Sequence, residues 1–219
     1  YVAQKLLKGA LGSNNFDANS RLCMSSAVAG YTRSLGSDGP PCCYEDIDHC
    51  DAVFLIGTNT AECHPVLFQR LAKRKRKNPN DVFVIVVDPR ATATTQIADL
   101  HLAIRPGTDL ALLHGIGHLL LHSSGLDVEF IEDATEGFRE YAALLASWTP
   151  ARVCHLCGVS EKQLQQAAKC FATSRALLSL WSMGVNQSVE GTATVCGLIN
   201  LHLLTGQIGR NGAGPFSLT

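Results

Sequence analysis

The sequence has neither a charge bias nor a long apolar run. Its 219 residues carry 18 Lys and Arg against 19 Asp and Glu, a formal net charge of −1. No basic surplus favours a nucleic acid or an anionic membrane as partner. The longest apolar stretches, such as residues 82–87, are far shorter than the roughly 20 residues that a membrane helix needs. We therefore expect no nucleic acid and no membrane as partner.

Two cofactor fingerprints are also absent. No G-x-G-x-x-G follows a predicted strand, since Gly57 lacks a second glycine at the required spacing. This argues against an NAD-binding dehydrogenase domain. The nine cysteines are odd in number and irregularly spaced, and the one C-x-x-C, at 154–157, has no second pair at zinc-ribbon distance. A chain of this length needs no disulfides, so we expect reduced thiols.

What is present is a core-rich α/β pattern, with 46% hydrophobic and 17% charged residues. Buried strands are predicted at 51–57, 82–87, 100–104 and 176–181. Helices are predicted at 1–10, 24–35, 64–77, 109–122, 127–133, 136–147, 159–173 and 189–205, with Asp109 as an N-cap and a loop at 212–216. Strand-helix repetition of this kind predicts a doubly wound, mainly parallel sheet with helices on both faces.

A loop with a glycine or a polar side chain follows each predicted strand, at 57–62, 88–90, 107–109 and 183–187. In a parallel sheet, ligands bind beyond the carboxyl ends of the strands, and an acidic residue such as Asp88 can bind a ribose there. Ordinary turn chemistry explains any single loop. Four such loops at one edge favour a nucleotide cradle.

Three other features allow two interpretations each. Cys23 stands where a predicted helix begins, and the helix dipole favours a thiolate there, but a lone cysteine is more often structural. The histidines at 114, 118 and 122 share a helix face that could hold zinc or simply pack. The basic residues 70 and 73–77 at a helix end suit either solvation or an acidic electron-carrier protein.

Five segments carry a resemblance to a known family: residues 14–30 around Cys23, and 39–46, 57–65, 181–187 and 201–206. Together they resemble the molybdenum-dependent nitrate reductases of the dimethyl sulfoxide reductase superfamily. The likeness runs from end to end. The Gly-Pro-Pro-Cys-Cys-Tyr-Glu-Asp stretch at 39–46 is most similar to the assimilatory, ferredoxin-dependent enzymes of cyanobacteria.

The resemblance implies molybdenum held by two molybdopterin guanine dinucleotides, with Cys23 as the protein ligand to the metal. Met24 follows it at the implied catalytic centre, and a Cys-Met pair favours nitrate over formate. The implied cofactor-binding residues are Asn19, Cys23, Ile56, Gly57, Thr58, Asn59, Thr60, Ala61, Glu62, Cys63, Asp88, Pro89, Arg90, Ala91, Thr92, Gly107, Thr108, Asp109, Met183 and Gln187.

The implied reaction is reduction of nitrate to nitrite by oxygen-atom transfer, in cytoplasmic nitrate assimilation. Electrons would come from ferredoxin or a similar donor through a 4Fe-4S cluster, whose four-cysteine motif this sequence lacks. We therefore expect a fragment that is inactive alone. Residues 1–17 would end a preceding domain, 18–212 would form the cofactor-binding domain, and 213–219 would open the next segment.

Three alternatives remain at this stage. The same superfamily includes formate dehydrogenases and periplasmic nitrate reductases, and a twin-arginine signal upstream would favour the periplasmic enzyme. A non-catalytic electron-transfer subunit could also keep this fold, but it would have no reason to keep the thiolate.

Overall fold

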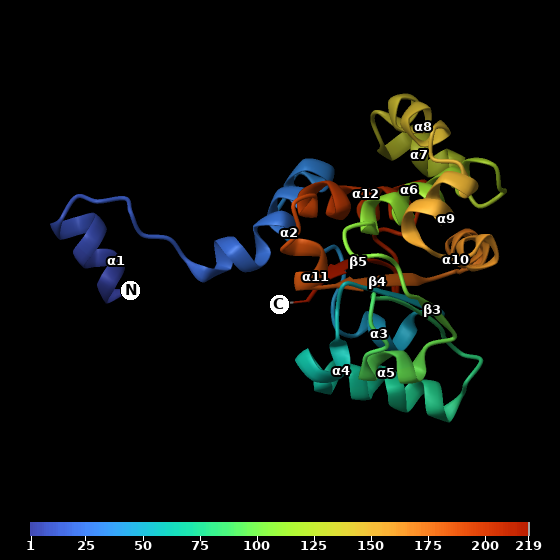
Figure 1. Cartoon of the computed structure of the whole chain (residues 1–219), viewed down its shortest axis with the longest axis horizontal. Coiled ribbons are helices and arrows are strands. Elements are labelled where there is room, and N and C mark those ends of the chain that lie inside the picture. The colour runs from blue at the N-terminus through green and yellow to red at the C-terminus, as the bar shows by residue number, and fades with distance from the viewer. Residues whose placement is uncertain (219) are drawn as a thin grey trace.

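A five-stranded parallel sheet forms the centre of the protein (Figure 1). The computed structural model describes residues 1–218. The strand order is β3-β2-β1-β4-β5. The strands are β1 (Ala52–Ile56), β2 (Phe83–Val87), β3 (Leu100–Leu102), β4 (Leu177–Trp181) and β5 (Gly214–Ser217). All four pairings are parallel, which confirms the predicted fold class.

Helices cover both faces of the sheet. The larger face carries α2 (Asn19–Leu35), α6 (Asp109–Leu121), α9 (Pro150–Cys157), α10 (Glu161–Thr173) and α12 (Gly191–Leu204), with α7 (Val128–Ala134) and α8 (Phe138–Ala146) packed outside them. The other face carries α3 (Asp46–His49) and α5 (Pro65–Lys77). The short elements are α1 (Val2–Gln4), a π-helix (Lys5–Ala10), α4 (Thr60–Cys63), a 3-10 helix (Ala93–Ile97) and α11 (Met183–Asn186).

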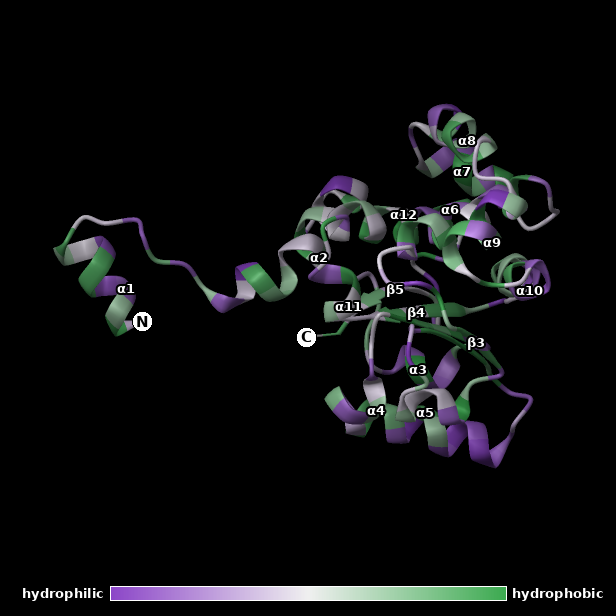
Figure 2. Ribbon diagram, viewed as in Figure 1, coloured by the Kyte–Doolittle hydropathy of each residue, from purple (hydrophilic) through white to green (hydrophobic). Residues whose placement is uncertain are grey.

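Strand side chains alternate between two hydrophobic cores. In β1, Phe54 and Ile56 face the larger core, whereas Val53 and Leu55 face the smaller one. This period of two, with every β1 residue buried, explains why the strands read as continuous apolar runs. Figure 2 shows the sheet as the apolar centre and the polar residues on the outer helices, above all at the end of α5.

The amino ends of the strands are closed by side chains. Asp51 accepts hydrogen bonds from the main-chain N–H groups of Arg175 and Ala176, and Asp99 accepts one from that of Val84. Gln207 accepts one from the N–H of Leu177. Because the backbone donors at this edge have partners within the chain, it offers little to a ligand.

Three local expectations were wrong. Helix α2 begins at Asn19, so Cys23 lies one turn inside it. Asp109 is the first helical residue of α6, and Thr108 is its N-cap. From Gly214 on, the expected loop at 212–216 is instead part of the edge strand β5, which Tyr31 binds by donating to the carbonyl of Pro215 and accepting from the N–H of Ser217.

The ends of the chain differ in their contacts. Residues 1–17 extend away from the body of the protein, with Tyr1, Val2 and Leu11 exposed. The sheet continues past residue 212 through β5. The last residue of the expected segment 213–219, Thr219, lies outside the described residues. Within residues 1–218, no helix is both long and apolar enough to cross a bilayer.

A buried polar pair joins α12 to β4. His202 is fully buried, and its Nε2 lies 2.7 Å from Ser179 Oγ. Burial lowers the pKa of His202 from 6.5 to about 3. A buried imidazole of this kind stays neutral in the folded protein. As the pH falls, the same imidazole takes up a proton at a higher pH in the unfolded chain than in the folded one.

We predict that His202 destabilises the protein progressively as the pH falls from about 6.5 toward about 3. Since the unfolded state binds the proton more tightly, the slope from this one group approaches about 1.4 kcal/mol per pH unit. His202→Gln removes the titration and keeps a hydrogen-bonding group, so its stability should fall less steeply. Urea unfolding at pH 7, 6, 5 and 4 measures this, with the exposed His155→Gln as control. Parallel pH profiles for wild type and His202→Gln would contradict the assignment.

Candidate functional site

Two glycines cross at the point where the strand order reverses, between β1 and β4. Gly57 follows β1 with φ 58°, and its carbonyl accepts a hydrogen bond from the N–H of Gly184 at 2.9 Å. A Cβ on Gly57 would lie 2.7 Å from the nitrogen of Val185, and one on Gly184 would lie 2.6 Å from the Cα of Gly57. Only glycine fits at either position. In sheets of this type, ligands bind at this switch point.

The loop after β1 is fastened to the loop after β2 by one buried hydroxyl. Thr94 Oγ1 donates to Asn59 Oδ1 and accepts from the N–H of Ala61, both at 3.0 Å. Thr94 is fully buried on the 3-10 helix Ala93–Ile97. The two loops therefore move as one unit at the edge of the sheet.

Two carboxylates lie beyond β2 and β3. Asp88 is buried, accepts the N–H of Arg90 at 2.8 Å, and pairs with the exposed Arg90 guanidinium at 3.6 Å. Burial raises the pKa of Asp109, and the negative charge of Asp88 adds to this effect. Carboxylates held in this way can accept hydrogen bonds from ribose hydroxyls or from the N–H groups of a base.

These loops line a cavity of about 390 Å³ that is open to solvent. Its lining comes from the segments after β1, β2, β3 and β4: Gly57, Asn59, Cys63, His64, Asp88, Pro89, Arg90, Pro106, Gly107, Asp109, Ser182, Met183 and Gly184. A second hollow shares Gly107 and Asp109 with it and adds Gln187. We call the two together the cradle.

Cys23 meets the cradle through Met183. The Cys23 Sγ lies 3.1 Å from the Met183 Sδ, although 160 residues separate them in sequence. Asn186 fixes this junction, because its side chain accepts from Trp181 Nε1 at 3.0 Å and donates to Met24 Sδ at 3.3 Å. Its carbonyl also accepts from Ser26 Oγ at 2.7 Å. The half-buried thiol is therefore held at one end of the cradle.

The remaining predicted residues do not line the cradle. Ile56 lies in the core, and the buried hydroxyls of Thr58 and Thr60 contact each other at 3.4 Å. Asn19 is exposed in the first turn of α2, and Met24 lines a shallow hollow on the outer surface of that helix. Outside the lining are also Ala61, Glu62, Ala91, Thr92 and Thr108.

Several residues of the site were not among the cofactor-binding residues expected from the sequence, including Thr94, His64, Pro106, Ser182 and Gly184. Thr94 gives no signal, because a threonine in a short 3-10 turn resembles any loop threonine. His64 lines the cradle just before Pro65, the first residue of α5. The proline marks the helix start and so could have pointed to it.

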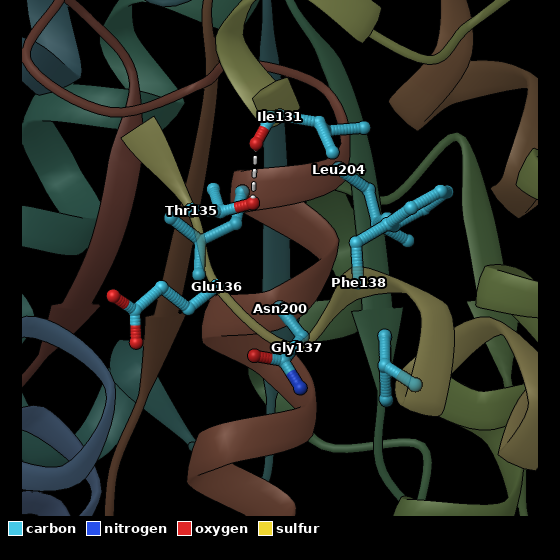
Figure 3. Close-up of a pocket in the computed structure, with 9 residues that line it drawn as sticks. Ile131, Thr135, Glu136, Gly137, Phe138, Asn200 and Leu204 are labelled. Atoms are coloured by element: carbon cyan, nitrogen blue, oxygen red, sulfur yellow. Dashed lines mark hydrogen bonds between the residues drawn. The ribbon is translucent and has the colours of Figure 1, made fainter. Parts of the chain in front are cut away.

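Other candidate sites lie away from the cradle. Within residues 1–218, no group of three or more metal-binding side chains forms, so Cys154 and Cys157 belong to no such group. A hollow of about 130 Å³ lies between α7, α8 and α12 (Figure 3). There the Thr135 hydroxyl donates to the carbonyl of Ile131, and no predicted site residue takes part.

Comparison with known proteins shows the family to which the chain belongs. The family model described as molybdopterin oxidoreductase matches residues 1–219. The chain belongs to the molybdopterin oxidoreductase family. The cradle at the switch point and the thiol at its end are therefore features of a molybdopterin oxidoreductase chain.

Two curated relatives and one solved structure are similar to the chain. The chain is 59% identical over its whole length to a protein named nitrate reductase from Synechocystis sp., and 48% identical to a periplasmic nitrate reductase from Desulfovibrio desulfuricans. It spans 30% of the length of each. The solved structure of acetylene hydratase from Pelobacter acetylenicus covers 94% of this chain and is itself covered over 27% of its length. It has a TM-score of 0.80 at 24% identity, which supports the fold alone.

We predict that Gly184→Ala destabilises the protein by more than a helix-interior or open-loop change would, on the order of 2–4 kcal/mol, because its Cβ meets backbone atoms. In Gly57→Ala, the Cβ also meets backbone atoms, and the alanine must in addition adopt a left-handed φ. Gly107→Ala is the matched control, since it has φ 80° but nothing within 4 Å of its Cβ. It should cost only the roughly 1–2 kcal/mol of backbone strain. Urea midpoints give the order, and equal losses at 184 and 107 would contradict the crossing.

Proposed function

We propose that this chain is the cofactor-binding part of a nitrate reductase that reduces nitrate to nitrite in nitrate assimilation. The observation that carries the proposal is the contact between Cys23 and Met183, which joins a thiol to a nucleotide-sized cradle. Support comes from the two relatives above, which are named nitrate reductase and periplasmic nitrate reductase. Thiolate is a favoured ligand for soft transition metals, so the donor set fits a molybdenum-pterin group.

The cradle also fits a guanine dinucleotide form of that cofactor. At the glycine crossing, Gly57 and Gly184 line the cavity, and a diphosphate could approach their backbone closely because neither residue carries a side chain. Asp88 and Asp109 would accept hydrogen bonds from the nucleoside end. Gln187 and Met183 would lie beside the pterin. We assign residues 18–217 to this domain, ending it after β5 instead of at 212 because β5 pairs within the sheet.

The bound cofactor would supply oxygen-atom transfer and two-electron chemistry. This chain would hold and orient it. Cys23 would give the metal a sulfur ligand, while Asn186 keeps the thiol-bearing helix against β4. The two clamped loops would keep the nucleotide in place, and Met183 would exclude water from the side of the thiol.

We propose ferredoxin as the electron donor, a 4Fe-4S cluster elsewhere in the whole protein, and a cytoplasmic location. All nine cysteines are free thiols, as expected in a reducing compartment. In the basic run, Arg70, Arg74 and Lys75 are occupied by Asp48, the carbonyl of Ile47 and Asp99. The other three basic residues, Lys73, Arg76 and Lys77, are exposed and supply positive charge for an acidic carrier.

We predict that Cys23→Ser in a full-length enzyme containing this chain lowers nitrite formation by at least about 100-fold, as expected for loss of a ligand to a catalytic metal. Reduced viologen and nitrate serve as substrates, and molybdenum content is measured in parallel. Cys196→Ser changes a half-buried thiol that is not among the residues lining the cradle; it is the control and should keep activity.

The outcomes separate the alternatives. If the molybdenum-loaded wild type forms no nitrite but oxidises formate, the substrate is formate and not nitrate. A wild type without molybdenum, made in a cofactor-competent host, would favour the non-catalytic electron-transfer subunit. Full activity of Cys23→Ser would remove the ligand role.

We predict that Thr94→Val reduces the content of bound guanine dinucleotide without unfolding the protein. Valine keeps the shape of threonine but cannot bond Asn59 or the N–H of Ala61, and each lost hydrogen bond costs about 1–3 kcal/mol. Nucleotide released by acid and measured by chromatography gives the occupancy. Thr95→Val, on the same 3-10 helix, is the control, because its hydroxyl bonds only the carbonyl of Thr92. Equal occupancy in both variants would contradict a role for Thr94.

A further inference from the structure

The histidine row on α6 divides into one buried and two accessible members. His114 is buried beside Trp148, with ring centres 4.9 Å apart, and burial lowers its pKa. His118 is half-buried and His122 is exposed at the end of the helix. A metal ion that arrives from solvent could therefore reach only the last two.

His118 is held in a form suited to metal binding. Its Nδ1 lies 2.9 Å from the carbonyl oxygen of Leu145 on α8. A carbonyl can only accept, so Nδ1 is the donor, and in the neutral tautomer with this hydrogen bond the lone pair is on Nε2. Metal-bound histidines are commonly fixed by this same second contact.

His122 stands one helical turn further, on the same side of α6. The ring centres of His118 and His122 are 4.9 Å apart, with the planes inclined at 65°. With metal–nitrogen bonds of about 2.0–2.1 Å, two imidazoles on one ion have ring centres roughly 4.5–5.2 Å apart, for ligand angles between octahedral and tetrahedral. The observed spacing falls in this range. A cation is also favoured at this place, because α6 ends at Leu121 with its carbonyl dipoles.

We propose that His118 and His122 form a two-histidine chelating site for a divalent late first-row transition metal ion. Two imidazoles suit Zn²⁺, Ni²⁺ and Cu²⁺, with Cu²⁺ bound more tightly than Zn²⁺. Mg²⁺ and Ca²⁺ prefer oxygen ligands and should not bind. No third protein ligand stands beside the pair among residues 1–218, so the remaining positions are open to water or to an external ligand. The site is separate from the cradle and independent of the proposed function.

The test must exclude zinc held by the nine cysteines. Diethyl pyrocarbonate modifies free imidazole nitrogens, and mass spectrometry reads the modification residue by residue. In the full-length protein stripped with chelator, micromolar Zn²⁺ should protect His118 and His122 together. His155 and His49, on other helices, should stay reactive, and Mg²⁺ at the same concentration should protect none of them.

Variants test the chelate itself. His122→Gln changes an exposed side chain and should leave the fold intact by circular dichroism. It should weaken zinc protection of His118 by about 10–100-fold, since even outer partners of a ligand contribute that much. His155→Gln should leave the protection unchanged. If His118 stays protected in His122→Gln, or if zinc protects His155 equally, the two-histidine site is overturned.

Discussion

The close contact of two backbones at Gly57 and Gly184 is the constraint on which the site depends. It forces the segments after β1 and β4 together, and the carbonyl of Gly57 accepts both the N–H of Gly184 and, at 3.4 Å, the Ser182 hydroxyl. Met183 lies between these two donors in sequence, so the same hydrogen bonds to the carbonyl of Gly57 position its thioether. No side chain occupies the crossing, and the backbone there remains accessible to a ligand.

The two edges of the sheet use their polar groups differently. At the amino ends, Asp51, Asp99 and Gln207 bind the main chain of neighbouring strands and close the edge. At the carboxyl ends, the hydrogen bond from Thr94 to Asn59 joins one loop to another, and the loops line an open hollow. A closed edge stabilises the fold. Loops that are hydrogen-bonded to each other outside the cavity, in contrast, fix the shape of the cavity before a ligand enters. Preorganisation of this kind lowers the entropic cost of binding.

The strands and the location of the cradle could be predicted from sequence because both follow from local patterns. Buried parallel strands appear as apolar runs, and the polar loops after them must meet at one edge. β5 could not be predicted, because Gly214 and Pro215 are typical of loops and the strand depends on β4 and the distant Tyr31 hydroxyl. Thr94 was missed for a similar reason: its role exists only once two loops are brought together.

The position of the thiol depends on packing two helical turns away from it. Helix α2 lies against α12 at Gly30, where an added Cβ would lie 2.3 Å from a methyl carbon of Val195. This close approach fixes the height and rotation of α2 over β4. Asn186 then joins the same helix to Trp181 at the end of β4. Because a helix transmits a shift at one turn to its neighbours with little loss, the placement of Cys23 beside Met183 is set by a glycine that contacts neither residue.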